Sequence, residues 1–162
     1  MKTQLITLAF SVTALLATTQ FAVAQSSDVA QIKSVVERET TAWNNRDAAA
    51  WADCWANVAE AGHLVSIPDG KGTVYFAQNT KMDMPASAKA TLDGMGKSTG
   101  EISRNTDYLI RVKGDAAFAQ FEQVNTATDG KKEYAHETRY LEKVSGAWKI
   151  VHVGAAFYKP TK

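Results

Sequence analysis

The stretch ETRYLEKVSGAWKIVHVGAAF, residues 137–157, decides the fold class of this chain. Apolar and polar residues tend to alternate on both sides of Ser145-Gly146, a dipeptide typical of a tight hairpin turn. Each arm is much longer than the usual strand of about 5–6 residues. Because long antiparallel strands twist and coil, this stretch predicts two strands of a strongly curled sheet.

Two further strand-like runs precede this hairpin and extend it into an antiparallel meander. The four strands are expected at residues 102–112, 116–126, 132–143 and 147–157. Gly114-Asp115 and Asp129-Gly130 separate the earlier runs and are also good hairpin residues. The middle of the chain adds a shorter predicted hairpin, from residues 64–67 and 73–76 around the turn Pro68-Asp69-Gly70-Lys71-Gly72.

Helical patterns lie before the meander. Apolar residues recur at helical spacing in the first helix, at Val29, Ile32, Val35, Val36 and Trp43. Ser27 and Asp28 are expected to cap it, and the charged residues Lys33, Glu37, Arg38 and Glu39 are expected largely on its other faces. Asn44-Asn45-Arg46 ends it, Asp47 caps a second helix over residues 48–58, and a third is expected over 84–95. Helices followed by a curled meander predict an α+β fold, with the helices on the concave side of the sheet.

The first 24 residues predict a cleavable secretory signal. Lys2 precedes an apolar run from Leu5 to Ala17, and Ala22-Val23-Ala24 is a small-x-small cleavage site. The apolar run is shorter than the ~20 residues that a membrane span requires. We therefore expect a periplasmic or secreted protein without a stable membrane anchor, and a single domain over residues 25–162.

Composition restricts the partners of this domain. Residues 25–162 hold 17 basic and 17 acidic side chains, so no broad basic footprint for nucleic acid is expected. Cys54 is the only cysteine, which excludes an internal disulfide, and its place between Trp51 and Trp55 favours a buried, inert thiol. Three histidines without metal-ligand spacing argue against a built-in metal, and no motif for a cofactor is found.

Two segments resemble nuclear transport factor 2-like domains. One is the helix junction Trp43-Asn44-Asn45-Arg46-Asp47 with Trp51 and Trp55 after it; the other is Glu137–Lys143, the turn at Gly146 and Trp148–His152. The chain looks most like the SnoaL-like group, which includes polyketide cyclases, and like the calcium/calmodulin-dependent kinase association domain. The resemblance implies a cone in which a curled sheet surrounds the helices and leaves a deep pocket. It also implies a homodimer through the outer face of the sheet.

Glu137 and Arg139 are the strongest candidates for polar contacts in such a pocket. They lie two residues apart on a predicted strand and therefore point to one face. An arginine in a pocket of low dielectric constant would bind a ligand carboxylate through paired hydrogen bonds. The resemblance to the kinase association domain places the arginine of its Glu-Thr-Arg motif at the pocket. Two alternatives stay open: the two side chains pair with each other, or they lie on the dimer face.

The register of the last hairpin decides which residues accompany Arg139. A two-residue turn at Ser145-Gly146 would place Arg139 opposite His152, whereas a three-residue turn with a bulge, starting at Val144, would place it opposite Val151. We favour the bulged turn, because it brings Val151, Val153 and Ala155 together beside Glu137 and Arg139. His136 and His152 then face away.

Aromatic side chains are the expected apolar lining, although aromatic residues at helical spacing are more often core residues. The candidates are Trp43, Trp55, Tyr75, Tyr108 and Phe121, with Trp43 and Trp55 first. For proton transfer, Tyr75, Asp53 and Asp69 are available without a recognisable motif, and His63 could act as a base or be merely solvated.

Three functions follow, and the sequence does not decide whether the protein is an enzyme. The first is an exported binder of a small apolar or carboxylate ligand. The second is an isomerase, dehydratase or cyclase that uses acid–base residues of the pocket. The third is a non-catalytic dimerisation or protein-interaction domain whose cone is filled by side chains.

Overall fold

The structure, a computed structural model, describes residues 26–66, 72–78, 83–98 and 100–160. The predicted signal segment lies outside these residues, as do Ile67 and residues 68–71 of the predicted turn. None of the helices within the described ranges is long and apolar enough to cross a membrane.

The N-terminal helix occupies residues 26–45, and a second helix begins at Ala48. The predicted junction between these two helices is thus confirmed. Arg46 ends the first helix in the left-handed region, with φ 57°. Asp47 then caps α2 (Ala48–Cys54) by accepting a hydrogen bond from Ala50 N at 3.0 Å. The predicted caps Ser27 and Asp28 are wrong, because both residues already lie within the helix.

Helix α2 ends four residues earlier than the pattern predicts. Trp55 adopts an extended backbone, with φ −97° and ψ 150°, and forms a parallel bridge with Ile150. The next residue, Ala56, donates its N–H to the carbonyl oxygen of Ile150 at 2.8 Å. Pairing with the sheet thus replaces the final turn that helical spacing would have continued.

Helix α3 (Met84–Gly94) confirms the third predicted helix. Asp83 caps it by accepting a hydrogen bond from Ala86 N at 3.1 Å, and Pro85 lies in its first turn, where a missing N–H is harmless. Met84, Ala88 and Leu92 form its buried side.

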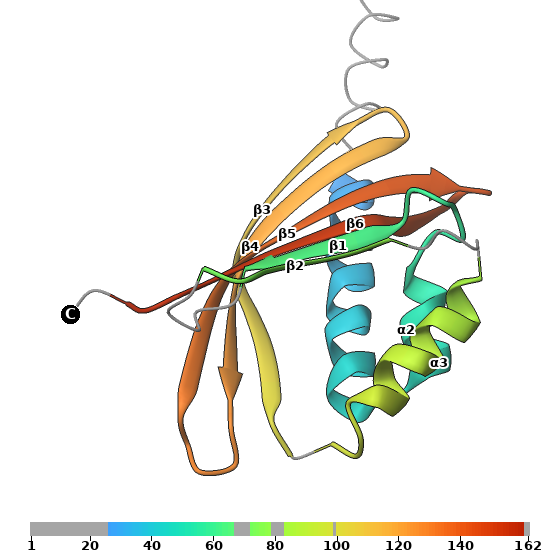
Figure 1. Cartoon of the computed structure of the whole chain (residues 1–162). Helices are drawn as coiled ribbons and strands as arrows, with labels where there is room; N and C mark the ends of the chain where they lie inside the picture. The colour runs from blue at the N-terminus through green and yellow to red at the C-terminus, as the bar shows by residue number, and fades with distance from the viewer. Residues whose placement is uncertain (1–25, 67–71, 79–82, 99, 161–162) are drawn as a thin grey trace, which may run out of the picture.

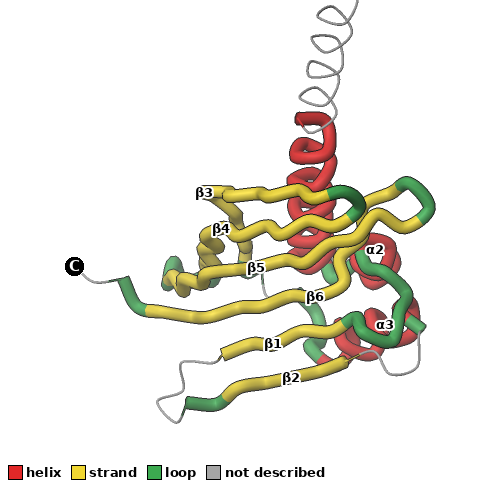
Figure 2. The backbone as a smooth tube through the Cα atoms, turned by 90° about the horizontal axis from the view of Figure 1, so that it is seen from above, coloured by secondary structure: helices red, strands yellow, loops and turns green. Residues whose placement is uncertain are grey.

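The described strands form one mixed sheet in the order β2-β1-β6-β5-β4-β3. The strands are β1 (Gly62–Ser66), β2 (Val74–Gln78), β3 (Ile102–Lys113), β4 (Ala116–Thr126), β5 (Lys132–Val144) and β6 (Ala147–Tyr158). The four long strands pair as the predicted antiparallel meander, and β1 and β2 form the predicted short hairpin. Strand β1 pairs in parallel with β6 and joins the two parts, as Figure 2 shows.

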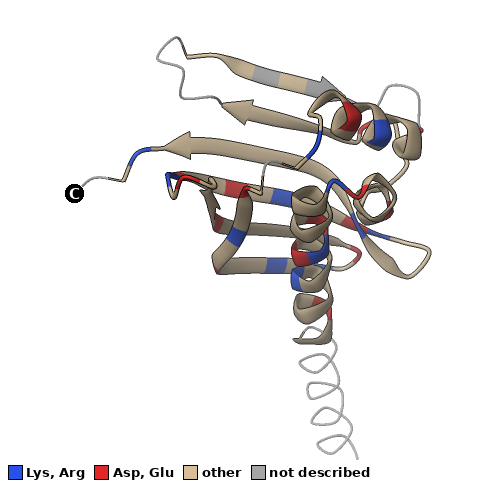
Figure 3. Ribbon diagram, turned by 90° about the horizontal axis from the view of Figure 1, so that it is seen from below, with Lys and Arg blue, Asp and Glu red and all other residues tan. Residues whose placement is uncertain are grey.

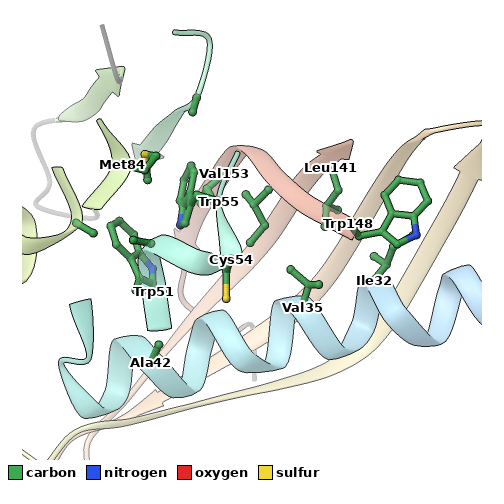
Figure 4. Packing of buried hydrophobic residues seen from close by; sticks show 14 of the residues in the cluster. Ile32, Val35, Ala42, Trp51, Cys54, Trp55, Met84, Leu141, Trp148 and Val153 are labelled. Carbon is green, nitrogen blue, oxygen red and sulfur yellow. The ribbon is translucent and has the colours of Figure 1, made fainter. Parts of the chain in front are cut away.

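The long strands bend around the helices, as the length of the runs predicted (Figure 1). Irregular pairing contributes to this curvature: the register of β3 shifts between Thr106 and Leu109, where Asp107 has φ 55°. The helices lie on the concave side, and the hydrophobic core lies between the two layers. Figure 4 shows Trp51, Trp55 and Met84 packed at one end of this core, and Trp148 with Ile32 at the other.

The predicted turn register is wrong in its details. Val144 pairs with Ala147, so Ser145 and Gly146 form a two-residue turn, and both have the positive φ that favoured hairpin turns require (50° and 82°). The bulge lies instead in β6, where Val151 has no partner between the pairs Leu141–Ile150 and Tyr140–His152.

Because of this bulge, Val153 and Ala155 still lie on the same face of the sheet as Glu137 and Arg139, as expected. Because it adds one residue to β6, Arg139 pairs with Val153 and Glu137 with Ala155. His152 pairs with Tyr140 on the opposite, convex face. The predicted grouping of Val153 and Ala155 with Glu137 and Arg139 is thus confirmed, whereas Val151 lies further along the strand.

Charges of both signs are interspersed over the helices and the long strands (Figure 3). Strands β1 and β2 contain no Lys, Arg, Asp or Glu.

Candidate functional site

A cavity of about 550 Å³ lies between the helices and the concave face of the sheet. Each layer contributes to it: Trp43 from the N-terminal helix, Trp51 from α2, Met95 after α3, and Val153 and Phe157 from β6. Its volume falls in the range of about 300–1,000 Å³ that is usual for small-molecule sites. The cone therefore encloses space that the side chains do not fill.

Three buried charged residues form one cluster in the wall of this cavity. Arg139 Nη1 lies 2.7 Å from Glu137 Oε2, and Arg139 Nη2 lies 3.1 Å from Glu39 Oε2. All three side chains are almost completely buried, with exposed fractions of 4% for Arg139, 5% for Glu137 and 7% for Glu39. The guanidinium is therefore held between two carboxylates.

Neighbouring groups complete this cluster. Arg139 Nη1 also donates to the carbonyl oxygen of Thr138 at 2.9 Å, and Trp51 Nε1 donates to Glu39 Oε1 at 3.0 Å. The guanidinium lies over the ring of Phe121, with 5.1 Å between Arg139 Cζ and the ring centroid. Such contacts fix the orientation of Arg139 without a ligand.

Burial and neighbouring charges shift the pKa values of Glu137 and Arg139 in opposite directions. Burial raises the pKa of the Glu137 carboxyl, and the neighbouring Arg139 only partly offsets this effect. Burial alone would lower the pKa of Arg139, but Glu39 and Glu137 outweigh it and raise that pKa, so the guanidinium stays protonated. Glu137 is therefore the carboxyl in this wall that burial makes easier to protonate.

The tryptophans form a chain of contacts along one side of the cavity. Ring centroids are 5.7 Å apart for Trp43 and Trp51, and 5.3 Å apart for Trp51 and Trp55. Trp51 and Trp55 differ in one important respect. Trp51 Nε1 is bonded to Glu39, whereas the buried Nε1 of Trp55 has no partner among the described residues.

Three other polar atoms in the lining are also buried without a hydrogen-bond partner among the described residues. They are Asn125 Oδ1, an acceptor, and two donors, Arg46 Nε and Arg139 Nε. Buried polar atoms are nearly always hydrogen-bonded in native proteins, since an unpaired one costs about 1–3 kcal/mol. Their presence in a cavity indicates positions where a bound molecule would make polar contacts.

The structure places four of the seven predicted binding residues at the cavity: Trp43, Trp55, Glu137 and Arg139. Tyr75 lies on β2, but its side chain is outside the described part. The remaining two, Tyr108 and Phe121, are not in the lining.

Tyr108 and Phe121 lie between the N-terminal helix and the sheet instead. Their rings are stacked 5.0 Å apart, and the Tyr108 hydroxyl donates to Glu37 Oε1 at 2.7 Å. Burial, together with this bond, raises the pKa of the Tyr108 hydroxyl. The prediction treated both rings as lining, but alternation along a strand identifies a face without saying how deeply a side chain is packed behind its neighbours.

Glu39 is the main site residue that sequence reasoning missed. Its expected place on another face of the helix is wrong, because it is buried and joins Arg139 to Trp51. A signal was available: Glu39 follows Val35 by four residues and precedes Trp43 by four, which places it on the apolar stripe. A charged residue at such a position indicates a buried partner.

His63 lies in the lining of the cavity, on β1. Burial lowers the pKa of its imidazole, and the nearby His152 contributes to the same effect. Of the other acids considered, Asp53 forms ion pairs with Arg38 and Lys149 outside the lining, and Asp69 lies outside the described residues. Cys54 is completely buried, as predicted, and burial raises the pKa of its thiol.

Comparison with known proteins identifies the fold. No family model matches the chain, and no curated protein is significantly similar to it. Solved structures do match: an NTF2-like protein with a cystatin-like fold from Novosphingobium aromaticivorans has a TM-score of 0.70 at 17% identity, covering 90% of this chain and 92% of that one.

Two further structures agree. An NTF2-like protein of unknown function from Shewanella oneidensis has a TM-score of 0.63 at 14% identity, with coverage of 80% and 98%. A candidate dehydratase of the NTF2-like family from Streptomyces avermitilis has a TM-score of 0.63 at 14% identity, with coverage of 84% and 99%. Identities this low establish shape and topology, and function has to come from the site. The chain has the nuclear transport factor 2-like fold.

Proposed function

We propose that this protein is an exported small-molecule-binding protein whose ligand occupies the cavity. The observation that carries the proposal is Trp55 Nε1, a buried donor that has no partner among the described residues and belongs to a residue lining about 550 Å³ of space. A ligand acceptor at this position would remove the cost of the unpaired N–H. Export rests on the predicted signal segment.

The rest of the lining supports a largely apolar ligand. Indole rings and the side chains of Val153 and Phe157 provide apolar surface, while Trp55 Nε1 and Asn125 Oδ1 offer a few polar contacts. An unfilled cavity of this size disfavours the third hypothesis, an interaction domain in which side chains fill the cone.

A second function, acid–base catalysis in the same cavity, is supported by Glu137. Burial raises the pKa of the Glu137 carboxyl, and Glu137 lines the cavity. General acids and bases in enzymes are usually found in such surroundings. The candidate dehydratase among the structural neighbours is consistent with such chemistry in this fold.

We also propose that the protein is a homodimer through the convex face of the sheet. Exposed apolar side chains on this face include Leu64, Phe76, Phe118 and Tyr140. Light scattering should give twice the mass of the processed chain, and charged replacements at Phe76 and Phe118 should halve it.

A fragment screen on the processed protein tests the binding proposal. Binding should raise the melting temperature and change the tryptophan fluorescence saturably, because three of the four tryptophans line the cavity. Ala155→Phe should block binding by filling the cavity while the protein stays folded, and Trp55→Phe should weaken binding of ligands that carry an acceptor. A screen without hits, or hits that bind Ala155→Phe equally well, would contradict the proposal.

Catalysis is tested with the hits themselves. Each hit is incubated with the protein and followed by NMR for exchange, isomerisation or loss of water. Glu137→Gln should abolish any such conversion while still binding the ligand. Conversion that survives this substitution would exclude Glu137 as the catalytic group.

A further inference from the structure

The cavity lining is more acidic than the chain as a whole. Its carboxylates belong to Glu39, Glu101, Glu133 and Glu137, and its guanidinium groups to Arg46 and Arg139. The described lining therefore holds four acidic and two basic side chains, whereas the domain is balanced. Glu39 and Glu137 are buried, Glu101 is half-buried and Glu133 is exposed, so this imbalance acts on a ligand most strongly where the lining is shielded from water.

Arg139 does not provide free positive charge for a ligand. With both carboxylates ionised, Glu39, Arg139 and Glu137 together carry a charge of −1; with a proton on Glu137 they are neutral. In neither state is the cluster positive. A ligand carboxylate that accepted from Arg139 Nε, the donor left without a described partner, would also lie near two glutamates, which weakens the carboxylate-binding role predicted for Arg139.

Arg46 is engaged in part, since only its Nε is buried without a partner among the described residues. Its Nη1 donates to the carbonyl oxygen of Trp43 at 2.7 Å, and its guanidinium lies over the Trp43 ring, 5.4 Å from the centroid. This contact shows that an indole face of the lining already accepts a cation. The faces of aromatic rings attract organic cations by the same electrostatics.

One buried acceptor of the lining lies beside two of its glutamates. Asn125 Oδ1 is buried and has no partner among the described residues, and Asn125 as a whole is 8% exposed. In the sheet register it pairs with Glu133 on one side and Ser103 on the other, and Glu101 lies two residues before Ser103. An amide oxygen and two glutamates in this region suit a ligand group with several N–H donors.

From these observations we infer that the ligand is a small organic cation, a protonated amine on an apolar frame. The ammonium group lies at the Asn125 end near Glu101 and Glu133, and the apolar frame lies against the tryptophans, where an acceptor on the frame would pair with Trp55 Nε1. The inference rests on the proposed binding function and names the ligand class of the same cavity.

Three probes that share a phenyl frame separate charge from shape. Phenethylamine is cationic at pH 7, 2-phenylethanol is neutral and 3-phenylpropionate is anionic. Isothermal titration should show phenethylamine binding at least about tenfold more tightly than 3-phenylpropionate, with 2-phenylethanol between them. Added salt should reduce the difference.

A matched pair of variants locates the effect. The double variant Glu101→Gln/Glu133→Gln removes two carboxylates from residues that are not fully buried, and should weaken phenethylamine about fivefold or more while leaving 2-phenylethanol unchanged. The control Glu60→Gln/Glu142→Gln makes the same change in net charge away from the cavity, and should leave both affinities unchanged.

Three results would overturn the inference: equal binding of the three probes, preference for 3-phenylpropionate, or equal losses in the two double variants. Absence of binding by all three probes would overturn it as well. In each case, hits from the fragment screen that Ala155→Phe blocks would leave the binding function intact, whereas failure of that screen would remove the function itself.

Discussion

Arg139 on β5 and Glu39 on the N-terminal helix are joined by a buried ion pair of 3.1 Å, although 100 residues separate them in the chain. The pair fixes the helix against the concave face of the sheet, beside the cavity. Glu137 completes the arrangement from the neighbouring inward-facing position of β5.

Removing the arginine should destabilise the protein strongly. Arg139→Met would leave Glu39 and Glu137 buried and facing each other, which should cost about 3–5 kcal/mol in the free energy of unfolding. Urea denaturation followed by circular dichroism measures this loss. The triple variant Arg139→Met/Glu39→Gln/Glu137→Gln removes the uncompensated charge and should be more stable than Arg139→Met alone. A triple variant less stable than the single one would show that charge is not the cause.

Trp51 and Trp55 allow a controlled comparison of two indole groups that lie in contact and four residues apart in the chain. Trp51→Phe removes the donor of Glu39 and leaves a buried carboxylate oxygen unpaired, whereas Trp55→Phe removes an N–H that has no described partner. Trp51→Phe should therefore be less stable than Trp55→Phe by about 1–3 kcal/mol in urea denaturation. For the affinity of acceptor-bearing ligands, we expect the larger loss in Trp55→Phe. If Trp51→Phe caused the larger loss in both stability and ligand affinity, the assignment of Trp55 to the ligand would be contradicted.

Acid should release a contact that holds the N-terminal helix to the last hairpin. Asp28 Oδ1 accepts hydrogen bonds from Lys143 Nζ and Trp148 Nε1, each at 2.9 Å, and these bonds lower the pKa of Asp28 from its ordinary value of 3.8. Because the folded pKa is the lower one, the stabilisation is fully present above pH 3.8 and is lost as the pH falls through the folded value.

Asp28→Asn should cost about 1 kcal/mol at pH 7, a value reduced by partial exposure of the site. It should also flatten the dependence of stability on pH below about pH 4. Urea denaturation at a series of pH values measures both effects. The exposed acid change Glu60→Gln is the control; a similar flattening in that variant would show that the acid effect is general.

Gly154 and Thr138 are paired on the convex face with no room for another methyl group. A Cβ at Gly154 would lie 2.6 Å from Thr138 Oγ1. Gly154→Ala should therefore destabilise the protein by about 1–3 kcal/mol through overpacking. Gly154→Ala/Thr138→Ala should recover most of this loss in thermal denaturation, and additive losses from the two substitutions would argue against a direct clash.

The secondary structure could largely be predicted from the sequence because its signals are local. Hairpin glycines, the Asp47 cap and the long alternating runs each act within a few residues, and the observed elements follow them closely. The end of α2 could not be predicted in this way. Trp55 leaves the helix to pair with Ile150, a contact with a strand almost a hundred residues later in the chain.

The candidate site shows the same division. Glu137 and Arg139 could be placed on the concave face by alternation, but the pairing of Arg139 with Glu39 depends on how a helix packs on the sheet. The bulge at Val151 was missed because its residues carry no turn signal; Ser145-Gly146 satisfies the turn on its own. Local sequence thus predicts the direction of a side chain, and tertiary packing decides its partner.

The position of β6 has a consequence for the order of folding. This strand is the last of the described strands in the chain, yet it lies between β1 and β5 and is the sole link between the short hairpin and the meander. During synthesis the sheet cannot be completed until this strand has left the ribosome, and its pairing with β1 closes a long loop, which makes folding slow. This order suits the proposed export, because a chain whose β6 has not yet appeared cannot complete the described sheet.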